Sequence, residues 1–208
     1  PQPTLEVGGR SGGRHIHTGF LTVHDMLFAN LRSADMVSPY RHAVPGPAFK
    51  GVYLWDSAFI AQIWHPWDRA VSEDLIRSVI ELRDGARLQH VVADFVRSAY
   101  TQPPLIAWAI RELDRHAPVS DAAIREFYPP LRDYHEWLNQ NRRLDNGLYF
   151  WEHPYESGVE NSLRFSSRDE RELSDTRSLG APDLSSYVVL QLEALEWMAN
   201  RLEREADA

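Results

Sequence analysis

Apolar residues recur three and four positions apart along most of this chain, and Pro or Gly residues interrupt the pattern repeatedly. Side chains at that spacing share one face of an α-helix, so each patterned segment predicts a helix that buries that face. The predicted helices cover approximately residues 18–32, 56–64, 71–84, 103–113, 120–138 and 183–202. Residues 86–100 fit either helical or strand periodicity, and no part of the chain gives a convincing sheet. We therefore predict an all-α fold.

Short polar residues and prolines mark the ends of these helices. Asp56, Ser120 and Asp183 each stand before a patterned segment, where a side-chain oxygen can accept the free N–H groups of the first turn. Pro129 and Pro130 should kink or interrupt residues 120–138, because proline lacks an N–H donor and crowds the preceding turn. The boundaries thus predict short helices, joined by long loops.

Composition sets the domain organisation. Residues 1–17 contain Gly, Pro and Arg and predict a loose lead-in, and residues 18–208 are long enough for one domain with a real core. The charged segment 166–178 is predicted to be a solvated or mobile loop, or a lid over a site.

Charge and cysteine content narrow the possible partners. A net charge of −8 argues against a nucleic acid or an anionic membrane as partner, and no apolar run is long enough for a membrane helix. The absence of cysteine excludes disulfides and thiolate chemistry, which fits a cytoplasmic protein and is also compatible with a secreted one. Although His15, His17, His24 and Asp25 suggest a metal site, their spacing matches no defined one. We therefore predict neither a metal nor a cofactor.

The segment at residues 151–162 carries the clearest chemical signal. It holds Glu152, Glu156 and Glu160 among aromatic residues, and Pro154 and Gly158 disfavour regular structure. Such a segment predicts a loop of defined shape, and loops on rigid scaffolds concentrate binding and chemistry. Aromatic rings can cover the apolar faces of a sugar while a carboxylic acid protonates the leaving oxygen. The segment therefore favours carbohydrate chemistry.

Four motifs occur in the order found in one group of glycosidases: YLWDSAF at 53–59, QPP at 102–104, ESGVENSLRF at 156–165 and PDL at 182–184. Through them the chain resembles the mannosylglycerate and glucosylglycerate hydrolases, bacterial relatives of processing α-glucosidase I in glycoside hydrolase family 63. Trehalases are more distant relatives. The resemblance implies an (α/α)6 toroid, a ring of six helical hairpins with the active site among the loops at one end.

The resemblance also implies that the chain covers roughly the first half of such a toroid, since a full ring needs more than roughly 300 residues. The family inverts the anomeric carbon with an acid and a base on opposite faces of the sugar. Its general base lies in the later half. We therefore expect the missing half, or a second chain, to complete the barrel.

By the same resemblance, Glu160 takes the position of the general acid, where the family pattern has Asp. A Glu can serve if burial among aromatic rings raises its pKa. Glu156 is expected to brace the loop by accepting backbone N–H bonds. The residues expected to contact the sugar are Tyr53, Trp55, Asp56, Gln102, Tyr155, Gly158 and Arg164. For Asp56 a helix cap is an alternative or additional role, and Arg164 is equally suited to brace neighbouring carboxylates.

These observations lead to one main hypothesis. The chain is expected to be an inverting α-glycoside hydrolase, or part of one, acting on a small glucoside or mannoside such as a glycosylglycerate or an oligosaccharide. The alternative is a non-catalytic carbohydrate-binding or structural (α/α) domain. A third hypothesis is a helical scaffold that binds a protein through its concave face.

Overall fold

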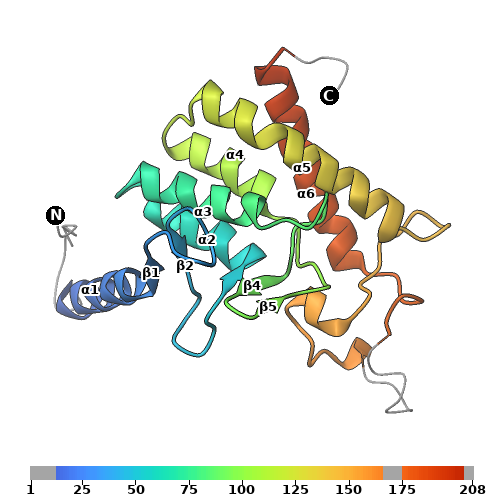
Figure 1. The fold of residues 1–208 in the computed structure, drawn as a ribbon, viewed down its shortest axis with the longest axis horizontal. Coiled ribbons are helices and arrows are strands. Elements are labelled where there is room, and N and C mark those ends of the chain that lie inside the picture. The colour runs from blue at the N-terminus through green and yellow to red at the C-terminus, as the bar shows by residue number, and fades with distance from the viewer. Residues whose placement is uncertain (1–12, 166–174, 204–208) are drawn as a thin grey trace.

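The computed structural model describes residues 13–165 and 175–203. Within these residues the chain forms six α-helices, as the hydrophobic periodicity predicts (Figure 1). They are α1 (Gly13–Asn30), α2 (Leu54–Trp64), α3 (Arg69–Glu81), α4 (Ile106–His116), α5 (Asp121–Asn141) and α6 (Pro182–Arg201). Two short 3-10 helices, η1 (Pro154–Ser157) and η2 (Leu163–Phe165), lie in the acidic segment.

Five very short strands join the helices. Strand β1 (Leu31–Arg32) pairs with β2 (His42–Ala43), and β3 (Val52–Tyr53), β4 (Val91–Ala93) and β5 (Val96–Arg97) form an antiparallel sheet in that order. The register sets Tyr53 opposite Val91, and Val92 opposite both Val52 and Arg97. The ambiguous residues 86–100 therefore include a β-hairpin, and this hairpin fixes the extended residues that lead into α2.

The helices pack in two layers (Figure 1). Helix α2 packs on α4 and α4 packs on α6, so these three follow one another in one layer. Helices α3 and α5 contact each other in the second layer, α3 against α2 and α5 against α6. The segments that enter α2, α4 and α6 are the ones that carry the sequence motifs, and hydrogen bonds connect them at one end of the molecule.

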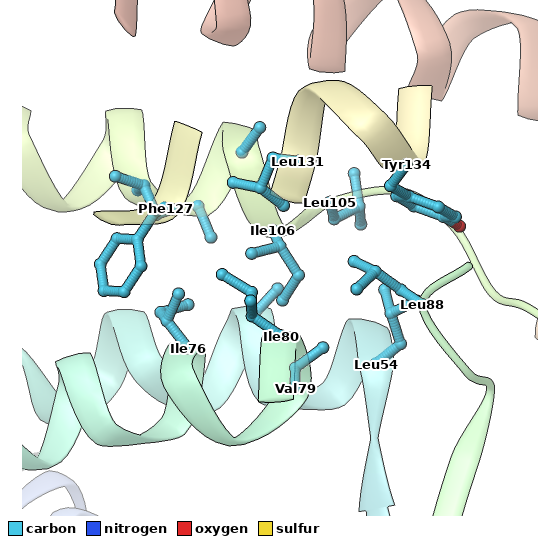
Figure 2. Close-up of a cluster of buried hydrophobic side chains, with 14 of the residues drawn as sticks. Leu54, Ile76, Val79, Ile80, Leu88, Leu105, Ile106, Phe127, Leu131 and Tyr134 are labelled. Atoms are coloured by element: carbon cyan, nitrogen blue, oxygen red, sulfur yellow. The ribbon is translucent and has the colours of Figure 1, made fainter. Parts of the chain in front are cut away.

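The core lies between the α2–α3 pair and the α4–α5 pair (Figure 2). Its fully or almost fully buried side chains include Leu54, Ile76, Leu88, Ile106, Phe127 and Tyr134. Each large apolar side chain buried in this way contributes about 1.5–3 kcal/mol relative to an exposed one. The core thus holds the starts of α2 and α4 in fixed positions.

Only one of the three predicted helix caps forms as expected. The Ser120 hydroxyl accepts the N–H of Ala123 at the start of α5. The cap at Asp56 is wrong, because α2 begins at Leu54 and Tyr53 is the extended N-cap residue. The cap at Asp183 is also wrong, since Pro182 opens α6 and Asp183 lies inside the first turn, where its carboxylate binds other side chains.

Helix α5 continues without interruption through Pro129 and Pro130, contrary to one of the predicted effects of these residues. Two prolines remove two backbone donors, which destabilises an isolated helix. Phe127, Tyr128 and Leu131 on either side of them are buried. Most helical stability in proteins comes from packing of an apolar face, and here that packing outweighs the lost hydrogen bonds.

Helix α1 begins at Gly13, five residues before the predicted start, so residues 13–17 are helical rather than a loose lead-in. Of the charged segment predicted to be mobile, residues 166–174 lie outside the described residues. The part that follows is anchored, because Thr176 is buried and its hydroxyl donates to the carbonyl oxygen of Trp151 at 2.5 Å. None of the helices in the described parts of the chain has the length and apolarity needed to cross a bilayer.

Candidate functional site

A cavity of about 310 Å³ lies where the segments entering α2 and α4 meet the acidic loop. Its walls come from four separate parts of the chain. The lining residues are Pro45, Phe49, Tyr53, Trp55, Asp56, His90, Gln102, Tyr155, Gly158 and Glu160. Every residue that we expected at the site, except Arg164, is therefore placed around one cavity.

The first turn of α2 supplies an indole and a carboxylate. Trp55 is partly buried, and its backbone N–H donates to the Gln102 side-chain oxygen at 3.3 Å. Burial raises the pKa of Asp56, against hydrogen bonds from its own backbone N–H and the Trp55 side chain, which lower it. A half-buried carboxylate at the positive end of a helix is suited to accept hydrogen bonds from two neighbouring hydroxyl groups.

Gln102 connects the start of α2 with the segment that enters α4. Its side chain is buried, and its backbone carbonyl oxygen accepts a hydrogen bond from the Tyr134 hydroxyl at 3.3 Å. Tyr134 is fully buried in the core on α5. Gln102 is therefore held in place from both its backbone and its side chain, which favours a defined orientation of the amide toward the cavity.

The acidic loop closes another side of the cavity. Glu156 has no exposed surface and accepts N–H groups of Thr101 at 3.0 Å and of Glu152 at 2.7 Å. The predicted bracing role of Glu156 is thereby confirmed. Gly158 follows in the left-handed conformation, with φ at +68°, and its backbone rests against the Trp55 ring.

Glu160 lines the cavity but is exposed, so it lies at the rim. Tyr155 is also exposed, at 55%, and its ring lies 4.5 Å from that of His153. An exposed carboxyl at the entrance can approach a bridging oxygen of a bound sugar from the open side. Glu160 is thus not buried among aromatic rings, the condition under which a Glu could serve as the acid, although Glu156 in the same loop is fully buried.

Nothing in the sequence pattern pointed to His90, which lines the cavity beside the predicted residues. Its ring packs edge-on against Tyr53 at 5.6 Å. Burial lowers the pKa of His90 to about 4, the carboxylate of Glu160 acts in the opposite direction, and His153 lowers it further. His90 is therefore neutral near pH 7. Only the pairing of β3 with β4 brings it beside the cavity, and a single sequence carries no signal of that pairing.

Arg164 does not line the cavity. Its guanidinium donates to Asp183 at 2.5 Å and lies over the ring of Phe165 at 4.5 Å, which is the bracing arrangement. Asp183 also accepts the indole N–H of Trp151 at 3.2 Å. Burial would raise the pKa of Asp183, but these two hydrogen bonds outweigh it and lower the pKa. Arg164 thus links η2 to the start of α6.

Among the side chains that the structure describes, no group of three or more His, Asp or Glu residues could hold a metal ion. His24 packs with Phe28 and Trp67, and its ring nitrogen lies 3.2 Å from the Asp25 carboxylate.

The following known proteins with similar sequences are glycosidases. A family model described as the mannosylglycerate hydrolase MGH1-like glycoside hydrolase domain matches residues 50–208. A mannosylglycerate hydrolase of Thermus thermophilus is 34% identical over an alignment of 136 positions, which covers 53% of this chain and 33% of that protein. A periplasmic trehalase of Escherichia coli is 28% identical over 114 residues, covering 52% of this chain and 19% of the trehalase.

Solved structures share the fold. A family 63 mannosylglycerate hydrolase from Thermus thermophilus in complex with Tris has a TM-score of 0.61 and 25% identity, covering 88% of this chain and 51% of its own. The structure of that hydrolase in complex with glucose gives a TM-score of 0.61 and 26% identity, covering 88% and 48%.

The chain spans about half the length of these solved relatives and a smaller share of the curated ones. The predicted all-α fold of (α/α)6 toroid type, present as about half of the ring, is thereby confirmed. Because the family model covers more than half of the chain, this protein belongs to the mannosylglycerate hydrolase MGH1-like glycoside hydrolases of the family 63 group.

Proposed function

We propose that the protein is an inverting α-glycoside hydrolase, or the half of one that binds the sugar and donates the proton. The substrate class is a small mannoside or glucoside such as mannosylglycerate. The observation that supports this function best is that Glu160, the residue at the acid position, lines the same cavity as Trp55 and Asp56.

The cavity has the parts that a sugar requires. Aromatic rings of Phe49, Tyr53 and Trp55 line it and can cover the apolar faces of a pyranose. Asp56 would accept hydrogen bonds from two hydroxyl groups, and Gln102 would add one donor and one acceptor. Together they would fix the orientation of the ring and direct its glycosidic oxygen toward the rim.

Glu160 at the rim would then protonate the leaving oxygen. A water molecule would attack the anomeric carbon from the opposite face, activated by a carboxylate in the other half of the toroid, and the configuration would invert. Glu reaches further than the Asp of the family pattern, which suits a group placed at the entrance rather than deep in the cavity.

The other half of the toroid is the proposed partner. Helix α1 exposes Ile16, Val23 and Met26, and α6 exposes Val189 and Leu192. Several exposed apolar side chains on one helix suggest a face that packs against another part of the protein. We infer that a further set of helical hairpins, equivalent to the part of the relatives that this chain does not span, packs on these faces and supplies the base.

The test compares two substrates that differ in their need for an acid. Glu160→Gln in the complete protein should cut turnover of mannosylglycerate by at least ~10²-fold, in line with the usual contribution of a general acid. Turnover of 2,4-dinitrophenyl α-mannoside should change little, because dinitrophenolate leaves without protonation. Glu193→Gln, outside the cavity on α6, is the matched control. Unchanged turnover of mannosylglycerate would remove Glu160 from the reaction.

A non-catalytic carbohydrate-binding domain is the second candidate, favoured by the exposure of Glu160. The two functions differ in one measurement. Calorimetric binding of glucose, with no hydrolysis of either substrate by the wild-type protein, would select the binding domain. Proton NMR of the first sugar released would establish whether a hydrolase inverts, since an α-mannoside then gives the β-anomer.

A further inference from the structure

A buried ion pair lies directly behind the acidic loop. Glu156 has no exposed surface, and Arg142, at the end of α5, is 5% exposed. The Arg142 guanidinium donates to Glu156 at 3.0 Å and lies 2.5 Å from the Glu152 carboxylate. Neither Arg142 nor Glu156 lines the cavity.

We propose that Glu156 and Arg142 are positioning residues that hold Glu160 in register with the sugar-binding side chains. This inference rests on the proposed function, because it assigns a purpose to the pair in that reaction. It concerns residues that act through Glu160 and do not touch the substrate.

The contacts of Glu156 join three segments. One carboxylate oxygen accepts the N–H of Thr101 and the Arg142 guanidinium, and the other accepts the N–H of Glu152. Thr101 immediately precedes Gln102, which bonds to the backbone of Trp55. Glu156 thereby fixes the acid loop to the same segment that orients the predicted sugar-binding residues.

Arg142 attaches this connection to the end of helix α5, whose position is fixed in the core. Its guanidinium lies over the Trp137 ring at 4.7 Å, and its carbonyl oxygen accepts the N–H of Phe150 at 2.9 Å. Helix α5 is anchored in the core by Tyr134 and Leu138, both fully buried. Three hydrogen bonds hold the Glu156 carboxylate, while the Arg142 Nε has no hydrogen-bond partner among the described residues. Separating the pair would leave a buried charge without its partner, which is strongly unfavourable.

Among the described residues, the Glu160 side chain has no hydrogen bond or ion pair that could replace this support. Val159 and Glu160 are both exposed, and η1 is a single turn that ends at Ser157. Glu156 and the Gly158 backbone against Trp55 connect Glu160 to the sugar-binding segments on its N-terminal side, whereas Arg164 on its C-terminal side joins the loop to Asp183 of α6. A displacement of about 1 Å at a catalytic group can cost ~10²-fold in rate, so this support matters for turnover.

The experiment uses two variants. Glu156→Gln keeps the side-chain shape but places an amide NH₂ group among the N–H donors of Thr101, Arg142 and Glu152. Arg142→Lys keeps the positive charge but removes the guanidinium group. Arg201→Gln is the control, because Arg201 also bridges two carboxylates, those of Asp114 and Asp121, in a more exposed place at the opposite end of α6. Each protein is assayed on mannosylglycerate and on 2,4-dinitrophenyl α-mannoside. The resonance of 5-fluorotryptophan at position 55, assigned by its loss in Trp55→Phe, reports loop contact by fluorine NMR.

Both variants should lower kcat on mannosylglycerate by at least ~10-fold with little change in KM, and should spare the dinitrophenyl substrate. The fluorine resonance of Trp55 should shift or broaden. The Arg201 control should change neither. Equal losses on both substrates would mean that the pair only stabilises the fold, and would overturn the proposal, as would unchanged kcat.

Failure of the proposed function gives a different result. If the wild-type protein hydrolyses neither substrate, the fluorine spectrum alone decides the positioning claim. An altered Trp55 resonance in both variants then supports a connection between the ion pair and the loop, and an unaltered resonance overturns it.

Discussion

The backbone of Gly158 lies against the indole ring of Trp55 so closely that a β carbon at position 158 would be 2.4 Å from a ring carbon. Gly158 also has φ at +68°, a conformation that side chains other than glycine rarely adopt. The acidic loop and the first turn of α2 are therefore in direct contact, and only glycine permits it.

Replacing Gly158 with alanine should destabilise the protein by more than the ~1 kcal/mol usual for backbone strain, because the methyl group must also displace Trp55. Gly85→Ala is the matched control, since Gly85 has φ at +59° with no atom close to its missing side chain. Urea unfolding of both variants measures the difference. Equal losses of unfolding free energy would mean that the methyl group at position 158 does not have to displace Trp55.

Asp56→Asn should raise the melting temperature at pH 7. It should also reduce the affinity for glucose by about tenfold or more, which is the usual contribution of a hydrogen bond to a charged group. Burial raises the pKa of Asp56, so its contribution to stability is fully present below about pH 4 and is lost as the pH rises through the folded pKa. The increase in melting temperature of Asp56→Asn over wild type should therefore disappear at about pH 3. A variant that is less stable than wild type at pH 7 would contradict this account.

His90 should make the protein less stable in acid. Its folded pKa of about 4 lies below the unfolded value of 6.5, so the unfolded chain binds the proton first and stability falls between pH 6.5 and 4. His90→Gln should recover on the order of 1–2 kcal/mol at pH 4, after allowance for the partial exposure of the ring. Unfolding free energies at pH 7 and pH 4 provide the check, with His116→Gln at the exposed end of α4 as control. Parallel losses in wild type and His90→Gln would exclude His90 as the cause.

Tyr134→Phe should cost about 1 kcal/mol of stability, because it removes the hydroxyl that contacts the Thr101 hydroxyl and the Gln102 carbonyl oxygen. The same change should weaken glucose binding modestly through Gln102. Tyr187→Phe on α6, where the ring is only partly buried, should have a smaller effect on the unfolding midpoint. Binding that is unchanged in Tyr134→Phe would show that this hydroxyl does not orient Gln102.

Local patterns predicted the helices well but several of their ends badly. The start of α2 was misplaced because Tyr53 is held extended by pairing with Val91, which lies far along the chain. The ambiguous residues 86–100 form a hairpin whose first strand pairs with the distant β3, Val52 opposite Val92. Pro129 and Pro130 remain inside α5 because buried neighbours stabilise it. In each case a long-range contact outweighed a local preference.

The sequence alone determined which kinds of side chain are available and which segments are helical, because both follow from residue type and short-range spacing. Only the tertiary structure decided that Tyr53, Gln102 and Glu160 share one cavity and that Arg164 turns to Asp183 instead. Glu156 and Glu160 stand four residues apart in one loop, yet the first is fully buried and the second is exposed. Burial depends on which distant segments pack against a residue, and chain neighbours that differ in those contacts differ in environment.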